Sequence, residues 1–212
     1  MKLSLIGSNG AIGQPLALLL AQSSRIAELS IYDIVDQQGV AMDLDHIDRD
    51  CRVESSRTVE ECIRGSEIVV LSAGVPRKPG MTRDDLFQIN ASIVADISKS
   101  VAKHASSAFF AIITNPVNSN VPIACKVFEK CGQKSTDKIF GVTTLDIMRA
   151  NTFIGKLLNK RAQDIFCPIV GGHSGETIIP LFSKAVHRKG DDIDLINSCN
   201  QADLKHLESQ IQ

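Results

Sequence analysis

The sequence predicts an α/β fold: a doubly wound parallel sheet followed by part of a second, α+β region. Three observations support this. A strand, a glycine turn and a helix open the chain, apolar strand-like runs then alternate with helical patterns, and the pattern changes near Gly141. In such folds ligands lie beyond the carboxyl ends of the strands. Functional residues are therefore expected directly after each strand.

The first elements come in the order strand, helix, strand. Lys2 to Ile6 is a short apolar run closed by glycine, and Ile12 to Leu20 is an apolar segment of helical character directly after it. Glu28 to Tyr32 forms a second strand that ends at Asp33, and Val53 to Ser55 indicates a weaker third strand. The predicted order of this region is β-α-β-α-β.

Two longer runs predict the centre of the sheet. Glu67 to Ala73 and Phe109 to Thr114 are continuous runs of β-branched and aromatic residues, as in strands that are covered on both faces. Between them, residues 84–104 carry apolar side chains at helical spacing, which predicts an amphipathic crossover helix with a break near Asn90. These runs are the predicted central parallel strands.

The pattern after Gly141 predicts a second domain, so that the domains are residues 1–141 and 142–212. A long helical pattern is followed by a strand at Ile165 to Val170 and a glycine-rich bend. The last apolar residues share one helical face with no predicted partner: Leu204, Leu207 and Ile211. The chain is therefore expected to stop inside this second domain.

The composition is that of a soluble globular protein, with 43% hydrophobic and 22% charged residues. A net charge of -1 offers no basic field for nucleic acid or an anionic membrane. The apolar run Pro15 to Ala21 is far too short to span a bilayer, and no charged leader precedes it. The six cysteines form no C-x-x-C pair and have no metal-ligand spacing, so we expect reduced, structural thiols and no metal.

A glycine-rich turn follows the first predicted strand and predicts a dinucleotide site of the Rossmann type. Its residues are Gly7, Ser8, Asn9, Gly10, Ala11, Ile12 and Gly13. By itself the glycine triplet is equally typical of a ligand-free strand-to-helix turn. Asp33, however, follows Gly13 by 20 residues at the end of the next strand, where a carboxylate binds the adenine ribose hydroxyls. The residue after Asp33 is Ile34 and not an arginine that could bind a 2′-phosphate, so NAD is favoured over NADP.

Four further segments lie where the reaction would be decided. They are Val75 to Arg83, Ile113 to Asn118, Thr143 to Arg149 and Gly171 to Gly175. Together with the glycine loop, these ordered motifs resemble the lactate/malate dehydrogenase family, in its bacterial and mitochondrial malate dehydrogenase branch. The similarity runs over the whole chain, although Ser8, Asn9 and Ala11 stand where this branch usually has smaller residues, and the family continues well beyond Gln212.

The resemblance implies a proton carrier, His173, with Asp146 as its partner. Oxidising a 2-hydroxy acid needs a base for the hydroxyl proton, and an imidazole near neutral pKa serves in both directions. The resemblance also implies that Arg77, Arg83 and Arg149 bind the two carboxylates of malate or oxaloacetate, since guanidinium groups grip planar anions bidentately. Arg77 and Arg83 would lie in a closing loop.

The remaining implied contacts belong to the strand ends. Asn115 would bind the substrate, and a set of residues including it would contact NAD: Asn90, Ile113, Thr114 and Asn115. The family further implies a homodimer and a place in the tricarboxylic acid cycle, in a bacterial cytoplasm or, alternatively, in the mitochondrial matrix or another organelle.

Three other functions compete with this interpretation. A lactate or other 2-hydroxyacid dehydrogenase is disfavoured by Arg77, since an unpaired cation in a pyruvate pocket is costly. Short-chain dehydrogenases need Tyr-x-x-x-Lys, and the single tyrosine, Tyr32, has Asp36 at that spacing. A truncated, non-catalytic NAD-binding module is the alternative from outside the enzymes.

Overall fold

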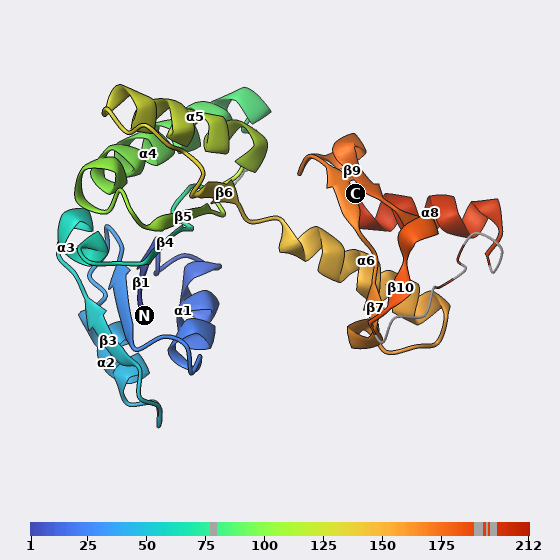
Figure 1. The fold of residues 1–212 in the computed structure, drawn as a ribbon, viewed down its shortest axis with the longest axis horizontal. Helices are drawn as coiled ribbons and strands as arrows, with labels where there is room; N and C mark the ends of the chain where they lie inside the picture. The colour runs from blue at the N-terminus through green and yellow to red at the C-terminus, as the bar shows by residue number, and fades with distance from the viewer. Residues whose placement is uncertain (77–79, 189–192, 194, 196–198) are drawn as a thin grey trace. The chain divides into compact units, whose positions relative to one another are not determined.

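The structure is a computed structural model that describes residues 1–212 except 77–79, 189–192, 194 and 196–198, and only the backbone of residues 83 and 84. The chain divides into two compact units, Met1–Gly141 and Val142–Gln212. Figure 1 shows the first unit in blue through green to yellow and the second in orange to red.

A parallel sheet forms the centre of the first unit. Within the described residues it has six strands in the order β3-β2-β1-β4-β5-β6, and every neighbouring pair is parallel. The strands are β1 Lys2–Ile6, β2 Glu28–Tyr32, β3 Arg52–Ser55, β4 Ile68–Leu71, β5 Phe109–Ile112 and β6 Ile139–Gly141. The predicted doubly wound sheet is confirmed. The strand order reverses between β1 and β4, where ligands of such sheets bind.

Helices cover both faces of this sheet. They are α1 Gly13–Ala21, α2 Gln38–Asp45, α3 Val59–Ile63, α4 Arg83–His104 and α5 Val117–Lys130. Leu3 and Leu5 pack in one core with residues of α1 and α2, whereas Ile6 packs in another with residues of α3, α4 and α5. The alternation follows from the two-residue period of a strand. Figure 1 shows α4 and α5 together on one side of the strands and α1 on the other.

Helix α4 is continuous, so the predicted break near Asn90 is wrong. Its N-cap is Thr82, which forms a capping box with Asp85, and the helix runs unbroken to His104. Asparagine weakens helices when its side chain competes for local backbone groups. Asn90 instead makes its hydrogen bonds to backbone outside the helix.

The central strands end earlier than predicted. β4 ends at Leu71 and β5 at Ile112, so Ala73 and Thr114 lie in the loops beyond them. The Asn115–Pro116 peptide bond in the second of these loops is cis. The chain therefore leaves the sheet just before the residues that the motifs single out.

The second unit combines helices with two small antiparallel sheets. Its elements are α6 Thr144–Leu157, η1 Ala162–Asp164, β7 Ile165–Phe166, β8 Ile169–Gly171, η2 Gly175–Thr177, β9 Ile178–Pro180, η3 Phe182–Lys184, β10 Val186–His187 and α8 Gln201–Ile211. β7 pairs with β10 and β8 with β9, so the single strand predicted for residues 165–170 is wrong. Pro168 separates the two strands and has no N–H to donate.

The last helix has a packing partner, contrary to the sequence-based expectation. Leu207 and Ile211 of α8 are buried in a cluster with Ala150 and Ile154 of α6 and Ile165 of β7. Burial of this apolar face is what holds a helix of this length. The unit thus has its own hydrophobic core.

Candidate functional site

The glycine loop follows β1 at the carboxyl edge of the sheet. Gly7 has a φ of +89°, and its N–H donates to the Tyr32 carbonyl at 2.9 Å, which fixes the loop to the end of β2. A Cβ at Gly7 would overlap the Ala73 backbone, and one at Gly13 would overlap the Gly7 carbonyl oxygen. The fold of the loop therefore requires glycine at both positions.

Gly10 differs because the protein leaves space beside it. A Cβ there would lie 3.6 Å from the Gly7 carbonyl oxygen, an ordinary van der Waals contact. The N-cap of α1 is Ile12, which makes no side-chain cap hydrogen bond to the described residues. The Gln14 N–H of α1 already donates to the Gly10 carbonyl at 3.0 Å, and Pro15 has no N–H. An anion here would therefore meet the positive end of the helix dipole, and the space at Gly10 allows a phosphate to approach closely.

The Asp33 carboxylate lies beside this loop, at the end of β2. Its Oδ2 accepts a hydrogen bond from the Asn9 N–H at 2.9 Å, and its Oδ1 accepts a weaker one from Val35 at 3.4 Å. The side chain is half-buried, whereas Ile34 next to it is 92% exposed. The carboxylate is thus oriented by the loop that would hold the pyrophosphate.

A hollow of about 520 Å³ is lined by Asp33 and also by Arg57, a positively charged residue that sequence reasoning missed. Gln37, Ser56 and Arg57 are among its lining residues. The register of β2 with β3 pairs Ile31 with Ser55, which carries Arg57 to the level of Asp33. No local sequence motif indicates a role for Arg57, because only strand pairing brings it to the level of Asp33, 24 positions earlier.

The loops after β4 and β5 are linked by Thr114. This residue is buried, and its hydroxyl donates to the Ala73 carbonyl at 2.7 Å. A Cβ on Gly74 would lie 2.9 Å from Thr114 Cγ2, so the two loops are in close contact. Asn115, by contrast, is exposed and Ile113 is half-buried. Of this group, Asn115 presents its side chain to solvent.

Asn90 is buried below these loops. Its Oδ1 accepts from the Val75 N–H at 2.8 Å, and its Nδ2 donates to the Asn115 carbonyl at 2.8 Å. The side chain therefore connects the loop after β4 to the loop after β5. The direct contact with a cofactor that the resemblance implies stays a prediction.

In the second unit, His173 and Asp146 form a short hydrogen bond. The distance between His173 Nδ1 and Asp146 Oδ2 is 2.6 Å. Asp146 belongs to the first turn of α6 and its side chain is 3% exposed, whereas His173 follows β8 and is half-buried. A buried carboxylate on one ring nitrogen selects the tautomer and supports a positive charge on the ring. Such a pair can move a proton through the other ring nitrogen.

A glycine positions the histidine loop. Gly171 has a φ of +90°, and a Cβ there would overlap the Thr177 carbonyl oxygen. That oxygen also accepts the Gly172 N–H at 3.0 Å, which closes the turn containing His173. The sequence folds locally in this way because glycine tolerates the left-handed backbone.

Arg149 joins the same cluster. Its Nη1 lies 3.8 Å from Asp146 Oδ1, one helical turn along α6, and its side chain is 43% exposed. Asp146 Oδ1 is buried and accepts no hydrogen bond from the described part of the chain. The cluster thus combines a carboxylate, an imidazole and an exposed guanidinium.

The structure leaves two of the predicted substrate residues without a described side chain. Arg77 lies outside the described residues, and Arg83 is the first residue of α4, described by its backbone alone.

A supporting residue that sequence reasoning missed is Asn151 of α6, whose Oδ1 accepts the Cys167 N–H at 2.9 Å. An asparagine on the buried face of a helix is the signal that could have indicated it.

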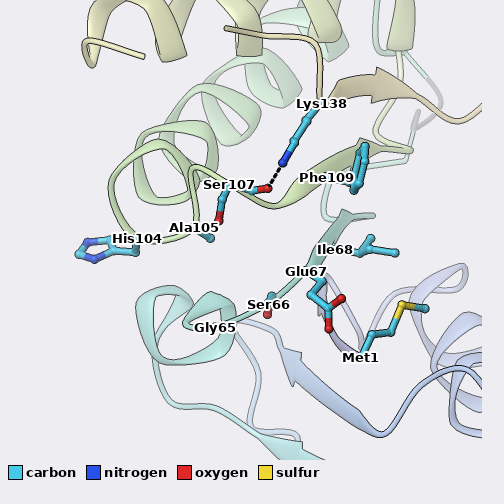
Figure 2. A pocket seen from close by; sticks show the side chains of 10 residues that line it. All are labelled: Met1, Gly65, Ser66, Glu67, Ile68, His104, Ala105, Ser107, Phe109 and Lys138. Carbon is cyan, nitrogen blue, oxygen red and sulfur yellow. Dashed lines mark hydrogen bonds between the residues drawn. The ribbon is translucent and has the colours of Figure 1, made fainter. Parts of the chain in front are cut away.

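The opposite edge of the sheet carries a hollow of about 550 Å³ (Figure 2). Lys138 points across it, donates to the Ser107 carbonyl at 2.7 Å and stands over the Phe109 ring. Glu67 accepts the Lys2 N–H at 3.2 Å. These charges are engaged with neighbouring protein groups, and the hollow lies at the amino ends of the strands, away from every motif.

The described residues offer neither a metal site nor a membrane span. Among them, no group of three or more His, Cys, Asp or Glu side chains is arranged to bind a metal ion. Likewise, no helix in the described ranges is both long enough and apolar enough to cross a membrane.

Malate and lactate dehydrogenases are similar to this chain in sequence and in fold. The chain is 50% identical over 186 residues to "Malate dehydrogenase, mitochondrial" of Felis catus, across 86% of this chain and 55% of that protein. The crystal structure of Cryptosporidium parvum malate dehydrogenase matches with a TM-score of 0.85 and 30% identity, over 99% of this chain and 67% of that one. Lactate dehydrogenase from Eimeria maxima, solved with NADH and oxamate, matches with a TM-score of 0.84 and 26% identity, over 99% and 64%.

Two family models match consecutive parts of the chain. Residues 1–141 match the NAD binding domain of lactate/malate dehydrogenase, and residues 143–212 match its alpha/beta C-terminal domain. The chain spans about half the length of the curated relatives it matches. With the glycine loop, Asp33 and the His173–Asp146 pair in place, the chain belongs to the lactate/malate dehydrogenase family, and its first 141 residues are an NAD-binding domain.

Proposed function

We propose that the protein is an NAD-dependent malate dehydrogenase, which interconverts (S)-malate and oxaloacetate in the tricarboxylic acid cycle. The observation that carries the proposal is the 2.6 Å hydrogen bond between His173 and the buried Asp146, in a chain whose first domain is an NAD-binding domain. The relatives named malate dehydrogenase support the same substrate.

The glycine loop and Asp33 fit NAD. The space at Gly10 and the uncapped start of α1 suit the pyrophosphate, and the Asp33 carboxylate suits the adenine ribose hydroxyls. We assign the cofactor to these residues, to the intervening Ser8, Asn9, Ala11 and Ile12, and to the strand-end residues Ile113, Thr114 and Asn115. Bound there, NAD would supply the hydride acceptor for oxidation of the substrate carbon, and NADH the hydride donor for the reverse reaction.

His173 is the proposed proton carrier. Because Asp146 accepts the Nδ1 proton, Nε2 is the nitrogen that takes the malate hydroxyl proton and gives it back to oxaloacetate. The buried Asp146 carboxylate stabilises the imidazolium that forms. Such acid–base assistance contributes about 10² to 10⁴ in rate.

The substrate carboxylates are assigned to arginines. Arg149 would bind the carboxylate beside the reacting carbon, since its guanidinium is exposed and lies one turn from Asp146. By resemblance, Arg77 and Arg83 would bind the distal carboxylate, and the exposed Asn115 would donate a hydrogen bond to the substrate. Arg77 is the residue that would distinguish oxaloacetate from pyruvate.

The test is NADH oxidation by the purified chain with oxaloacetate and with pyruvate. We expect turnover with oxaloacetate, its loss in His173→Ala, and a much larger loss for oxaloacetate than for pyruvate in Arg77→Gln. Preference for pyruvate would support the lactate dehydrogenase alternative, to which the structural similarity to Eimeria maxima lactate dehydrogenase also points. NADH binding without turnover on either substrate would support a non-catalytic NAD-binding module.

A homodimer is proposed as the working assembly. Apolar side chains are exposed on two helices of the first unit, namely Leu18 and Leu19 of α1 and Met42 of α2. Helices α1 and α2 contact each other, and exposed apolar side chains on adjoining helices favour a protein interface. Sedimentation should give twice the chain mass, and Leu19→Lys should shift it toward the monomer. A monomeric wild-type chain at micromolar concentration would contradict the proposal.

The name of one relative bears on the compartment in which this protein works. The mitochondrial name of the Felis catus relative favours a mitochondrial matrix over a bacterial cytoplasm or another organelle. Fractionation of the native cell, with detection of this chain, would decide between these compartments.

A further inference from the structure

Six exposed lysines lie in the last two turns of α4 and α5 and in the loop after α5. Residues 99–138 contain these six lysines, two acidic residues and no arginine, so their formal charge is +4 in a chain whose net charge is -1. A surface of like charges attracts groups of the opposite sign. We name this set of residues the basic band: Lys99, Lys103, Lys126, Lys130, Lys134 and Lys138.

The fold gathers the basic band at the amino edge of the sheet. α4 and α5 each follow a strand of the parallel sheet and lead back to the next one, so both helices end at this edge (Figure 1). The Gln133 side chain donates to the Ala102 carbonyl at 2.8 Å, which joins the loop after α5 to the last turn of α4. The Phe110 N–H donates to the Lys138 carbonyl at 2.7 Å. Lysines from two helices and one loop therefore lie close together.

Few acidic groups offset the charge of the basic band. Lys99 pairs with Asp96 at 2.9 Å and Lys126 with Glu129 at 2.7 Å, and both pairs are exposed and lie within one turn of a helix. The other four lysines of the band form no ion pair with the residues that the structure describes. The band therefore keeps most of its positive charge.

Helix stability accounts for only part of the basic band. A cation in the last turn of a helix interacts favourably with the helix macrodipole, which explains Lys103 of α4 and Lys130 of α5. Lys134 and Lys138 follow α5 in a loop and have no such role. Lys138 donates to the Ser107 carbonyl, a neutral group that leaves the charge of the ammonium in place. The loop lysines thus call for another explanation.

The basic band borders two hollows of about 550 and 510 Å³, and Lys138 lines both. Figure 2 shows Lys138 extending across the first hollow, with Phe109 beside it. Phe109 is 48% exposed, and its ring centre lies 5.3 Å from Lys138 Nζ. One acidic residue also lines each hollow, Glu67 the first and Asp137 the second. The surface therefore combines positive charge with a concave, partly apolar region.

We propose that the basic band and the hollow beside Phe109 form a docking surface for an acidic segment of a partner protein. Carboxylates of the segment would lie over the lysines, and one apolar side chain would enter the hollow. Nucleic acid is a poorer fit, because the band lacks the arginines and the several stacking aromatic side chains of such surfaces. The face of a bilayer would leave the hollow unfilled.

The docking surface is separate from the other sites proposed for this chain. It lies at the amino edge of the sheet, whereas the glycine loop and Asp33 follow the carboxyl ends of β1 and β2. α4 and α5 pack on one face of the sheet, and α1 and α2, which carry the proposed dimer contacts, pack on the other. An acidic partner can therefore bind a dimer that also holds its cofactor.

The test is a fluorescence anisotropy titration of the 212-residue chain with a labelled peptide of glutamates that has one central phenylalanine. At about 0.05 M salt we expect saturable binding, which should weaken at least about tenfold at ~0.3 M salt because screening increases. Reversal of three charges of the band should raise the Kd of the peptide at least about tenfold, since each attraction becomes a repulsion. This variant carries Lys103→Glu, Lys130→Glu and Lys134→Glu.

A second variant and a matched control separate loss of the band from loss of folding and from a change in net charge. Glutamate in the last turn of a helix opposes the macrodipole, so the same three lysines are also changed to glutamine, which should raise the Kd about threefold. The control reverses three exposed lysines of the second unit and should leave the Kd within about twofold of wild type. Its changes are Lys156→Glu, Lys184→Glu and Lys205→Glu.

A second peptide tests the hollow beside Phe109. An all-glutamate peptide should bind about threefold to tenfold more weakly than the peptide with phenylalanine, since it has no apolar side chain to bury. Equal affinity of the two peptides would overturn the assignment of the hollow.

Three results would overturn the docking surface as a whole. The first is no binding of the peptide at low salt, and the second is an equal loss of affinity in the glutamate variant of the band and in the control. The third is tighter binding to phosphatidylglycerol vesicles or to a thymidine oligonucleotide than to the peptide, which would assign the band to a membrane or to nucleic acid. The titration uses neither NADH nor oxaloacetate, so its outcome does not depend on the proposed malate dehydrogenase activity.

Discussion

The two units of the chain present their functional groups in different ways. In the first, the important features are set by the backbone: glycines without room for a Cβ, the positive end of α1, and two loops whose backbone carbonyls accept from Thr114 and Asn90. In the second, they are side chains, a buried carboxylate with an imidazole and a guanidinium at hand. Binding a dinucleotide needs a fixed shape, whereas moving a proton needs one correctly paired ring.

The contrast is sharpest at Asp146, where we expect the largest effect. Asp146→Asn replaces the acceptor of the His173 Nδ1 proton with an amide that can donate, which favours the wrong tautomer. Turnover should fall by about 10² to 10⁴, while NADH binding by residues 1–141 stays within about twofold. Steady-state kinetics and fluorescence titration measure the two quantities.

Asp164→Asn is the control for this prediction. Asp164 is an exposed carboxylate of the same unit, paired with Arg161 at 3.6 Å. Its loss should leave turnover unchanged, since exposed ion pairs contribute about 0 to 1 kcal/mol. If Asp146→Asn retained wild-type kcat, the second unit would not work through this pair.

Substitution of two glycines in the first unit should affect different quantities, stability for Gly13 and NADH affinity for Gly10. Gly13→Ala places a Cβ on the Gly7 carbonyl oxygen and should lower the free energy of unfolding by about 1 to 3 kcal/mol. Gly10→Ala has space, so stability should be kept, while NADH affinity falls about tenfold because the methyl group takes the place of the phosphate. Denaturant unfolding and NADH titration of both variants test this.

The result for Gly10→Ala decides between two accounts of the loop. If NADH binds equally well to that variant, the cofactor does not approach the loop at Gly10. Loss of stability in Gly10→Ala would mean that the loop is more crowded than its contacts indicate.

Asp33 and Arg57 allow the cofactor preference of the first unit to be shifted. Asp33→Ser removes the charge that repels a 2′-phosphate and leaves Arg57 lining the same hollow. The ratio of NADPH to NADH efficiency should rise about tenfold, and Arg57→Ala in that background should reverse most of the gain. A gain that survives loss of Arg57 would assign phosphate binding to another group.

The first unit was largely predictable from sequence because its signals are local. Strand ends, glycine spacing and Asp33 can be read within about 30 residues, and the doubly wound sheet follows from them. Arg57 and the contacts of Asn90 could not be predicted, because strand register and loop packing create them. The predicted break in α4 failed for the same reason: Asn90 bonds to distant backbone.

Some elements carried too weak a local signal. α5 begins after Pro116 and contains Pro122, and its first turn is rich in polar residues, so its propensity for helix is low. Burial of Ala124 and Phe128 against the sheet compensates for this. In the second unit, Pro168 divides one apolar run into strands of two sheets, and no local pattern specifies their partners.

In that unit the proposed catalytic pair could be named only through resemblance. A histidine in a glycine bend and an aspartate 27 residues earlier have no common spacing rule. Tertiary structure alone brings them to hydrogen-bond distance. Short-range sequence patterns therefore indicate the NAD-binding domain, whereas the proposed proton-transfer pair depends on long-range contacts.

Two buried thiols provide a comparison of the units' internal stability, with the smallest expected effect. Cys62 lies in the core of the first unit and Cys167 in that of the second, both with no exposed surface. Burial raises the pKa of Cys62 and raises that of Cys167 to about 11, so both remain protonated thiols at neutral pH. Each should be alkylated only when its own unit opens.

The small sheets of the second unit should open more readily than the six-stranded sheet. Cys167 should therefore be alkylated about tenfold faster than Cys62, and both more slowly than the half-buried Cys125 and Cys131.

Since the folded-state pKa of Cys167 is raised above its ordinary value of 9.0, the stability of the second unit should be constant below that pH and fall as pH rises toward about 11. Cys167→Ala should remove the Cys167 part of this pH dependence, whereas burial also raises the pKa of Cys199, which keeps its own part. Iodoacetamide labelling at one pH with mass spectrometry measures the rates, and denaturant unfolding at several pH values measures the stability. Equal labelling rates for the two thiols would mean that the units open together.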